Sequence, residues 1–472
     1  MVSTPSGNTA PPLLSAEVFS IPLEDSKYII YAPARRAAFA GNAEVVRLIS
    51  QLQSGVCAGF EGENAALLEL LRALDIVDAG PEHKPSDTCH GDPVPVSVTL
   101  FLTTACNLRC TYCYASAGSR APTSMALETA IRGIDFVVAN AIRLGSSHFE
   151  VGYHGGGEPT TNWRVLTESF NYAYRRASET NLELRTSLAT NGMLDDLQAN
   201  WIITHLGSAN LSCDGVPEVH DRCRLTVAGK GSSERVLRTL RRFDEAQFSY
   251  GIRLTVTAEN IGRLPESVEF LCSNFRPSVI QVEPVYLLGR GSHAASAESD
   301  EFISAYRAAA GCAESLGRRI LFSGARLGTL TNHFCGVSRD SFCLSAAGNV
   351  SACYEAFEEN NASAGVFFYG TPAEGATGYS FDRTVLEGLR SRVVESREHC
   401  RGCFAKWSCG GDCHYRWVAT TGGGQFAGTA RCRVIRELTK DQILARIAAS
   451  GGLSWHEPPG RQARDAPPRR SC

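Results

Sequence analysis

The chain has little net charge and no long hydrophobic run, and both absences narrow its class. Its 472 residues carry a formal net charge of −3, so no global field favours nucleic acid or a membrane surface as a partner. No apolar run reaches the roughly 20 residues of a membrane-spanning helix. Residues 1–15 hold neither a basic n-region nor a long apolar core, so we expect no secretory signal. The sequence therefore predicts a cytoplasmic protein with no nucleic-acid partner and no membrane segment.

Cysteine, in contrast, is abundant and clustered. Eighteen cysteines in a chain without a signal argue against disulfides and for metal binding. Eleven of them form two fields along the chain: Cys106, Cys110 and Cys113, and then Cys335, Cys343, Cys353, Cys400, Cys403, Cys409, Cys413 and Cys432. The length predicts two or three domains.

The first 95 residues precede any of these clusters. Residues 1–15 are rich in Ser, Thr, Pro and Gly, and we expect them to be disordered. Over residues 16–80 we expect a compact winged-helix-like unit, in which strand-like runs precede helical runs. The strand-like runs are Val18–Pro22, Tyr28–Ala32 and Ala37–Ala40, and the helical runs are Ala43–Leu52 and Asn64–Leu74. Residues 81–95 read as a proline-rich linker.

Residues 96–325 alternate between strands and helices. The strand-like runs are Val96–Leu102, Phe149–Tyr153, Leu184–Ala189, Ala209–Cys213, Gly251–Thr257 and Ile280–Tyr286. The helical runs are Ser124–Leu144, Trp163–Ala177, Leu197–His205, Glu234–Glu245 and Leu264–Asn274. This pattern predicts an α/β fold with parallel strands and right-handed crossovers, as an open sheet or a partial barrel. In either case a site forms at the carboxyl ends of the strands, where the first cysteine cluster lies.

Residues 326–445 are loop-rich and cysteine-dense, and we expect a separate domain that metal clusters hold together. Residues 446–472 end in a Pro/Arg-rich stretch, which predicts a disordered tail.

The spacing of Cys106, Cys110 and Cys113 suits one kind of metal group. Three thiolates at this pitch can hold three corners of a four-iron cluster and leave the fourth iron open. The alternatives are a zinc knuckle, which would need a fourth ligand, or three unrelated thiols. With Tyr112 before the last cysteine, the motif resembles the signature of radical S-adenosylmethionine (SAM) enzymes. The resemblance implies a partial (β/α)6 TIM-like barrel, a [4Fe-4S] cluster, and SAM as the source of a 5′-deoxyadenosyl radical.

Other motifs stand where this family has them. Gly155–Pro159 follows the second strand, Thr190–Gly192 the third and Ser212–Gly215 the fourth. The resemblance implies that SAM is bound by Tyr112, Gly156, Gly157, Glu158, Pro159, Asn191, Ser212 and Arg224. The plainer alternatives are an ordinary turn for the glycine run, a turn hydroxyl for Ser212 and a surface salt bridge for Arg224.

The eight later cysteines resemble the SPASM domain of peptide-modifying radical SAM enzymes. That resemblance implies two auxiliary clusters and three [4Fe-4S] clusters in all. In the family's pattern, Cys335, Cys343, Cys353 and Cys413 hold the first auxiliary cluster, and Cys400, Cys403, Cys409 and Cys432 hold the second. Swapped pairings stay open, as does a pair of structural zinc ions. In the sulfatase-maturing branch an aspartate serves as base at this point. Here Tyr354 and Glu355 follow Cys353, which counts against a sulfatase maturase. Glu355 is the candidate catalytic base, with Tyr354 as the other possible proton acceptor, and an exposed carboxylate is the plainer alternative for Glu355.

These resemblances predict the function. We expect a radical SAM peptide maturase that abstracts hydrogen from a ribosomally made precursor and forms an oxidative crosslink. Its N-terminal unit would bind the precursor's leader as an added strand, and a reductase, flavodoxin or ferredoxin would supply electrons. The alternatives are a sulfatase-maturase-like oxidation of a protein side chain, a peptide epimerase, and a non-enzymatic metal-cluster scaffold that binds peptides.

Overall fold

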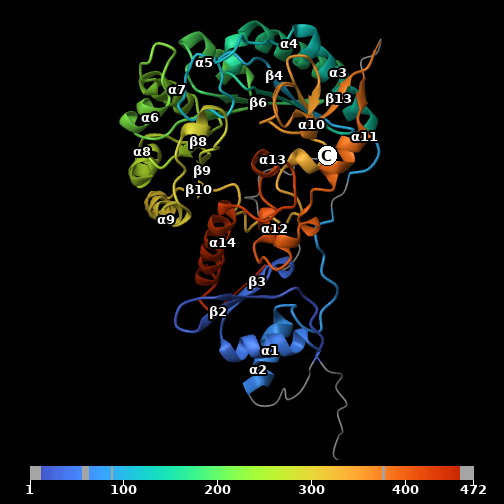
Figure 1. Ribbon diagram of the computed structural model, residues 1–472, viewed down its shortest axis with the longest axis vertical. Coiled ribbons are helices and arrows are strands. Elements are labelled where there is room, and N and C mark those ends of the chain that lie inside the picture. Colours follow the sequence, from blue (N-terminus) through green and yellow to red (C-terminus); the bar gives the residue numbers. More distant parts are fainter. Residues whose placement is uncertain (1–11, 56–62, 87–88, 375–377, 458–472) are drawn as a thin grey trace, which may run out of the picture.

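The protein is described by a computed structural model that covers residues 12–55, 63–86, 89–374 and 378–457. Figure 1 shows a curved α/β sheet at one end, an N-terminal unit at the other, and a C-terminal extension (residues 326–449) between them. Among the described residues, no helix is both long and apolar enough to cross a membrane.

Seven parallel strands in chain order form the centre of the large sheet. They are β4 (Ser97–Phe101), β5 (His148–His154), β6 (Glu183–Thr190), β7 (Ser208–Ser212), β8 (Tyr250–Val256), β9 (Val279–Pro284) and β10 (Ile320–Leu321). The first six match the predicted runs, and β10 adds a two-residue strand beside β9. The sequence pattern is strong here because these strands are buried on one face and alternate in burial.

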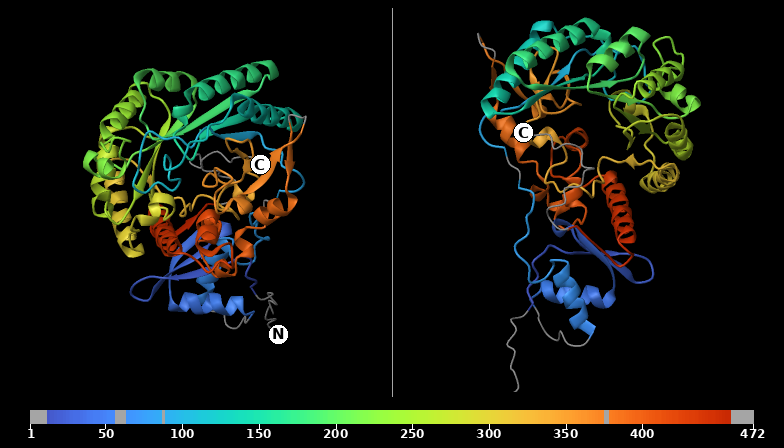
Figure 2. Two further views of the ribbon diagram at one scale, coloured as in Figure 1. Left: turned by 45° about the horizontal axis from the view of Figure 1, so that its top comes forward. Right: turned by 180° about the vertical axis from the view of Figure 1, so that it is seen from behind.

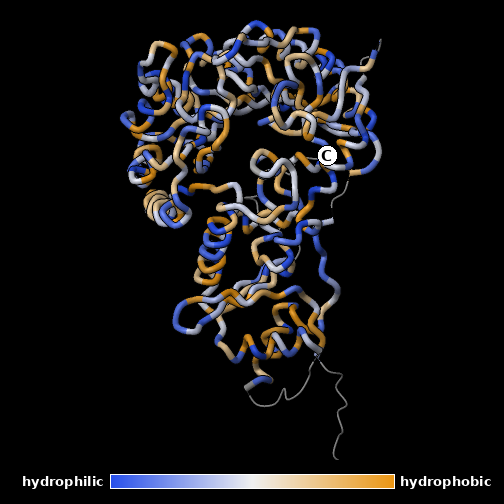
Figure 3. Tube along the Cα trace, viewed as in Figure 1, coloured by the Kyte–Doolittle hydropathy of each residue, from blue (hydrophilic) through white to orange (hydrophobic). Residues whose placement is uncertain are grey.

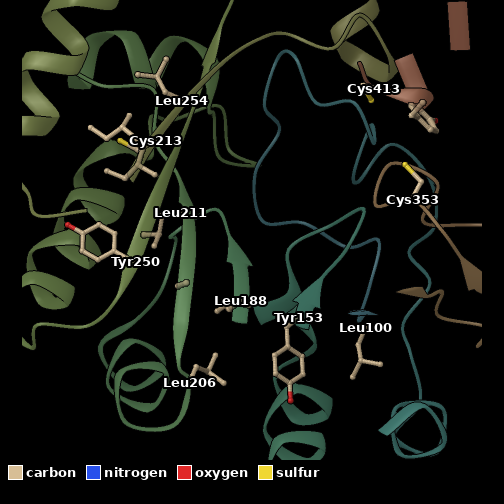
Figure 4. Close-up of a cluster of buried hydrophobic side chains, with 14 of the residues drawn as sticks. Leu100, Tyr153, Leu188, Leu206, Leu211, Cys213, Tyr250, Leu254, Cys353 and Cys413 are labelled. Carbon is tan, nitrogen blue, oxygen red and sulfur yellow. The ribbon is translucent and has the colours of Figure 1, made fainter. Parts of the chain in front are cut away.

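Helices cover the outer face of this sheet (Figure 2). They are α3 (Leu127–Leu144), α4 (Trp163–Thr180), α5 (Asp196–His205), α6 (Pro217–Cys223), α7 (Ser233–Glu245), α8 (Leu264–Asn274) and α9 (Ser299–Ser315). Leu100, Tyr153, Leu188, Leu211 and Leu254 of successive strands join one buried core with these helices (Figure 4). We call the opposite side of the sheet its inner face.

The C-terminal extension continues the large sheet, so the expected separate domain over residues 326–445 is wrong in this respect. Strand β11 (Cys343–Leu344) pairs in parallel with β4, and β12 (Val350–Ser351), β13 (Phe368–Pro372) and β14 (Tyr379–Phe381) follow in antiparallel order. The extension also contains α10 (Ala364–Phe367), α11 (Arg383–Arg390), α12 (Lys406–Cys409), α13 (His414–Thr421) and α14 (Ala430–Ala449). Its local sequence looked loop-rich because the strands are two to five residues long.

The N-terminal unit contains the five predicted elements. They are β1 (Phe19–Pro22), β2 (Lys27–Ala32), β3 (Ala37–Asn42), α1 (Ala43–Gln53) and α2 (Glu63–Ala73). One face of the sheet packs on α1 and α2 through residues that include Ile30 and Phe39. The other face packs on α14 through Ile29 and Tyr31. Figure 3 shows the long hydrophobic stretches of this unit.

Both expected disordered ends are partly ordered. Leu14 forms a bridge with Val77, so order begins within the predicted tail 1–15. At the other end α14 extends to Ala449, and Ser454–His456 form β15, an antiparallel partner of β3. Burial of Trp455 against the sheet explains why this segment is ordered although its neighbours are polar. Residues 1–11 and 458–472 lie outside the described residues.

Candidate active site

The first cysteine cluster lies on a loop that we call the cysteine loop (residues 104–118), directly after β4. Backbone hydrogen bonds fasten it to the segment after β5 and to the end of α6: Glu158 N donates to Ala105 O at 2.8 Å, and Thr111 N donates to Cys223 O at 2.9 Å. Arg290, which follows β9, donates from Nε to Cys110 O at 2.9 Å. Cys106, Cys110 and Cys113 are half-buried at this edge. The loop is therefore held over the carboxyl ends of the parallel strands.

The glycine run after β5 is required by close packing. A Cβ atom on Gly157 would lie 2.0 Å from the carbonyl oxygen of Ala105, and one on Gly156 would lie 2.3 Å from the ring of Phe357. Neither space admits a side chain without displacement of the cysteine loop or the C-terminal extension. An ordinary turn therefore does not explain Gly157. The lack of a side chain at Gly157 allows the glycine run to lie against the cysteine loop.

Glu158 is buried at 2% exposure and joins two strand ends. Its Oε1 accepts from the hydroxyls of Thr160 and Thr190, both at 2.8 Å, and its Oε2 accepts from Asn191 N at 2.7 Å. Burial raises the pKa of this carboxyl, and these donors oppose the effect. Asn191 in turn donates from Nδ2 to Asn107 Oδ1 at 2.7 Å. Contact of Glu158 and Asn191 with SAM stays a prediction.

A buried cluster on the other side of the cysteine loop includes a residue that the sequence analysis missed. Arg224 donates to both carboxylate oxygens of Asp214, and the Tyr112 hydroxyl donates to the same carboxylate. Arg224 is therefore a buried ion-pair residue and not the surface salt bridge we considered. Asp214 lies two residues after Ser212, the last residue of β7. An acidic residue this close to the end of a strand was the feature of the sequence that could have identified Asp214 as a site residue.

The inner face of the sheet is polar and partly open. Arg185 and Ser187 on β6 and Asn210 on β7 alternate with core residues and are exposed. Parallel sheets are normally buried on both faces, so this exposure is unusual. Ser212 lies half-buried on the same face and pairs in register with Arg253 of β8, which the sequence analysis did not single out.

The eight later cysteines gather in the C-terminal extension. Cys335, Cys353 and Cys413 are close enough to influence one another's charge, and so are Cys400, Cys403 and Cys432. Figure 4 shows Cys353 and Cys413 beside the large core. The positions of Cys343 and Cys409 do not decide between the two expected sets.

The arrangement of the cysteine thiols bears on which metal group they could bind. None of the described cysteines forms a disulfide, and no three Cys, His, Asp or Glu side chains among them converge on one metal ion. A four-iron cluster binds each thiolate at a different iron atom, so its sulfurs need not meet at one point. Three thiols on the cysteine loop and eight in the extension therefore fit one open and two filled clusters.

Glu355 lies at the junction of the sheet and the extension. Its Oε2 atom is buried and has no hydrogen-bond partner among the described residues, so the exposed-carboxylate alternative is wrong. Burial raises the pKa of Glu355 to about 7. The neighbouring Tyr354 ring stacks on His154 of β5 at 5.0 Å between centroids. Residues of the extension therefore reach the carboxyl end of β5.

Comparisons with known proteins agree with this geometry. Residues 100–271 match the family model of the radical SAM superfamily. The sporulation killing factor maturation protein SkfB of Bacillus subtilis is 26% identical over 217 residues, 44% of this chain and 47% of SkfB. The structure of native anSMEcpe with bound AdoMet and Kp18Cys peptide has a TM-score of 0.61 at 18% identity, covering 76% of this chain and all of that one. The structure of Streptococcus suis SuiB bound to S-adenosylmethionine has a TM-score of 0.51 at 13% identity, covering 89% and 99%.

The chain spans about half the length of the first curated relatives it matches. The two structural likenesses show the fold, an α/β radical SAM fold with a C-terminal extension. Residues 100–271 of this chain are therefore similar to the radical SAM superfamily. The curated relatives that match this region include two maturases, SkfB and the mycofactocin maturase MftC of Mycobacterium ulcerans.

Proposed function

We propose that this enzyme is a radical SAM maturase that forms an oxidative crosslink in a ribosomally made peptide. The observation that carries the proposal is the position of the cysteine loop, fastened over the carboxyl ends of the strands beside a polar, partly exposed inner face. An extended peptide suits this face, since exposed Arg185, Ser187 and Asn210 offer polar contacts along two adjacent strands.

The residues present fit the groups that the family implies. Cys106, Cys110 and Cys113 would hold the open cluster, and Gly156, Gly157, Pro159, Asn191 and Ser212 would line the SAM site. When bound, SAM and its cluster supply a radical that takes one hydrogen atom from a substrate carbon. Asp214 keeps Tyr112 and Arg224 in place, and Glu158 keeps the two strand ends together.

Crosslinking removes two hydrogens from the peptide. One leaves as the abstracted atom, and the other leaves as a proton and an electron. Glu355 would take the proton, which is supported by its buried Oε2 without a hydrogen-bond partner among the described residues and by burial, which raises its pKa to about 7. The two filled auxiliary clusters that the eight cysteines would hold provide a destination for the electron. This supports crosslinking over epimerisation, which requires no net oxidation.

A second candidate is the oxidation of a protein side chain. The likeness to anSMEcpe favours it, and the buried carboxylate of Glu355 could act as its base. The missing aspartate after Cys353, where Tyr354 and Glu355 stand instead, counts against it. The partners proposed with the first function are a precursor peptide with a leader, which the N-terminal unit would bind, and a reductase, flavodoxin or ferredoxin as electron donor.

The test is anaerobic reconstitution with iron, sulfide, SAM and dithionite. We expect deoxyadenosine from the parent chain and background levels from a Cys106→Ala, Cys110→Ala, Cys113→Ala variant. Mass spectrometry of a short peptide encoded beside the enzyme should then show the loss of two hydrogens per event. No mass change would indicate epimerisation, activity on a sulfatase peptide alone would favour the second candidate, and no deoxyadenosine would refute both.

A further inference from the structure

Two arginines in the C-terminal extension are packed beside the expected auxiliary-cluster cysteines, and neither forms an ion pair with a described carboxylate. They are Arg326, which precedes Cys335, and Arg397, which precedes Cys400. Arg431 in the same region shows the usual arrangement, with Glu283 at 2.9 Å and Asp412 at 3.0 Å. Arg397 is buried and Arg326 is half-buried. An arginine withdrawn from solvent is normally paired with an acid, so the two exceptions need an explanation.

Arg397 is 5% exposed and has few partners. Its Nη1 donates to the carbonyl oxygen of Gly411, and its Nη2 lies 2.7 Å from His414 Nδ1. Its Nε is buried and has no hydrogen-bond partner among the described residues. The guanidinium lies 4.5 Å from the ring centroid of Phe426. The guanidinium of Arg397 therefore has no counter-charge among these partners, because they are a carbonyl, an imidazole and an aromatic ring.

Arg326 makes three hydrogen bonds, all to backbone carbonyls. Its Nε, Nη1 and Nη2 donate to Ser408 O at 3.2 Å, Phe334 O at 2.9 Å and Cys409 O at 2.8 Å. These bonds give each of its three nitrogen atoms a partner and do not neutralise its charge. They also fix the guanidinium against the backbone of Phe334 and Cys409, next to two expected cluster ligands.

Both arginines are within electrostatic reach of cysteines from the two expected sets. For Arg397 these are Cys400 and Cys409 of one set and Cys413 of the other. For Arg326, which also donates to the backbone of Cys409, they are Cys409 of one set and Cys335 of the other. Asp412 is within reach of both arginines and Glu283 within reach of Arg326, but both carboxylates are already paired with Arg431. The other negative charge near the two arginines would come from the cysteine sulfurs once they bind iron.

Packing on aromatic rings is the plainer explanation. It applies to Arg397, which stacks on Phe426, and to Arg326, which lies 5.2 Å from the Phe334 centroid. A cation–π contact offsets only part of the cost of burying a charge, however, whereas thiolates around iron supply a compact negative charge. Aromatic contact also does not explain why both arginines are within electrostatic reach of cysteines from both expected cluster sets.

We propose that Arg326 and Arg397 raise the reduction potentials of the two auxiliary clusters. The proposal rests on the proposed function, because it requires those clusters to be present. When a cluster accepts one electron, its net negative charge grows by one, and a fixed positive charge nearby stabilises that state. The two arginines thereby make the clusters better acceptors of the electron that leaves the peptide.

The experiment is a redox titration monitored by electron paramagnetic resonance. It uses the full chain with Cys106, Cys110 and Cys113 replaced by alanine, so that only the auxiliary clusters contribute. In this background, Arg397→Gln and Arg326→Gln should each shift a midpoint potential to more negative values. We expect at least a tenfold change in the reduction equilibrium constant, which is about 59 mV for a one-electron couple.

Two control variants separate charge from packing. Arg397→Lys keeps the charge and should keep most of the potential. Arg401→Gln removes the same charge next to Cys400 from a side chain that is 79% exposed, where solvent screens it, and should change the equilibrium constant less than threefold.

Loaded Arg397→Gln and Arg326→Gln variants with parent potentials would overturn the proposal. If the Gln variants lose iron while Arg397→Lys keeps it, the positive charge is required for assembly of the auxiliary clusters. That result supports the same electrostatic interaction between the arginines and the clusters. If Arg397→Lys also loses iron, Arg397 is a packing residue and the proposal fails. Absence of auxiliary iron from the background chain itself would instead refute the proposed function.

Discussion

Arg224 and Asp214 form a buried ion pair that also anchors the cysteine loop. Arg224 donates from Nε to Asp214 Oδ2 at 3.0 Å and from Nη2 to Oδ1 at 3.2 Å. The two side chains are 6% and 0% exposed. Tyr112, which stands between Cys110 and Cys113, donates its hydroxyl to the same carboxylate. One acid therefore connects the end of β7 to the loop that carries the first cysteine cluster.

Replacing this acid should damage both stability and activity. Asp214→Asn leaves Arg224 buried without a counter-charge, so we expect the free energy of unfolding to fall by about 3–5 kcal/mol. Tyr112 loses its charged acceptor, and deoxyadenosine formation should fall with it. Denaturant titration and product assay measure the two effects. Glu234→Gln, which breaks the exposed Arg238–Glu234 pair, should cost about 0.5 kcal/mol or less; equal effects of both variants would contradict the anchor role.

A methyl group at Gly157 should displace the cysteine loop. Its Cβ would overlap the carbonyl of Ala105, 2.0 Å away, and backbone cannot yield as a side chain can. We expect Gly157→Ala to lose the iron of one cluster, about four atoms per chain, while auxiliary iron stays. Gly262→Ala is the control, because its Cβ would meet nothing within 4 Å. Iron analysis decides, and full iron in Gly157→Ala would show that the loop tolerates the shift.

The C-terminal strand should stabilise the N-terminal unit. Trp455 on β15 is 4% exposed and packs with Ile29, Tyr31 and Ile447. We expect Trp455→Ala to cost about 3–5 kcal/mol, as other Trp truncations do. Hydrogen exchange should quicken at Ala40, whose N–H donates to Leu453 O. Leu453→Ala, at a side chain that is 81% exposed, should change little; the same protection of Ala40 in both variants would contradict a stabilising role for β15.

The contribution of His220 to stability should fall between pH 7.5 and pH 5.5. Burial lowers the pKa of His220 to about 4, below its ordinary value of 6.5. The unfolded chain therefore binds a proton in this range while the folded chain does not, so acid favours unfolding. For one such group the loss is about 1 kcal/mol over this interval.

Denaturant midpoints at the two pH values test this assignment. His220→Gln should reduce the pH dependence, and His83→Gln, at an exposed side chain, should leave it unchanged. The dependence left in His220→Gln has two opposing sources, because burial lowers the pKa of His154 to about 4 and raises that of Glu355 to about 7. The difference in slope between parent and variant isolates His220. An unchanged slope in His220→Gln would contradict the assignment.

Local patterns account for the parts of the fold that the sequence predicted. The six strands from β4 to β9 alternate in burial, so their periodicity is visible in single segments. The helices between them carry apolar residues at helical spacing, and the first cluster's spacing fits within eight residues, Cys106 to Cys113. Each of these signals needs only neighbouring residues.

Contacts between distant segments account for what was missed. Strand β11 has two residues, and only its pairing with β4 and β12 makes it a strand. Asp214 and Tyr112 are 102 residues apart, so no motif shows that they meet. Trp455 orders a segment whose composition indicates disorder, because a distant sheet buries it.

The sequence by itself determined the chemistry, because thiol spacing depends on a few adjacent residues. It also determined the order of the parallel strands, because each strand shows its own pattern of burial. Only the tertiary structure decided which charges are paired: Arg224 meets Asp214, whereas Arg326 and Arg397 donate to backbone carbonyls such as those of Cys409 and Gly411. The reason is physical, since the energy of a buried charge depends on what surrounds it in space and not on its neighbours along the chain.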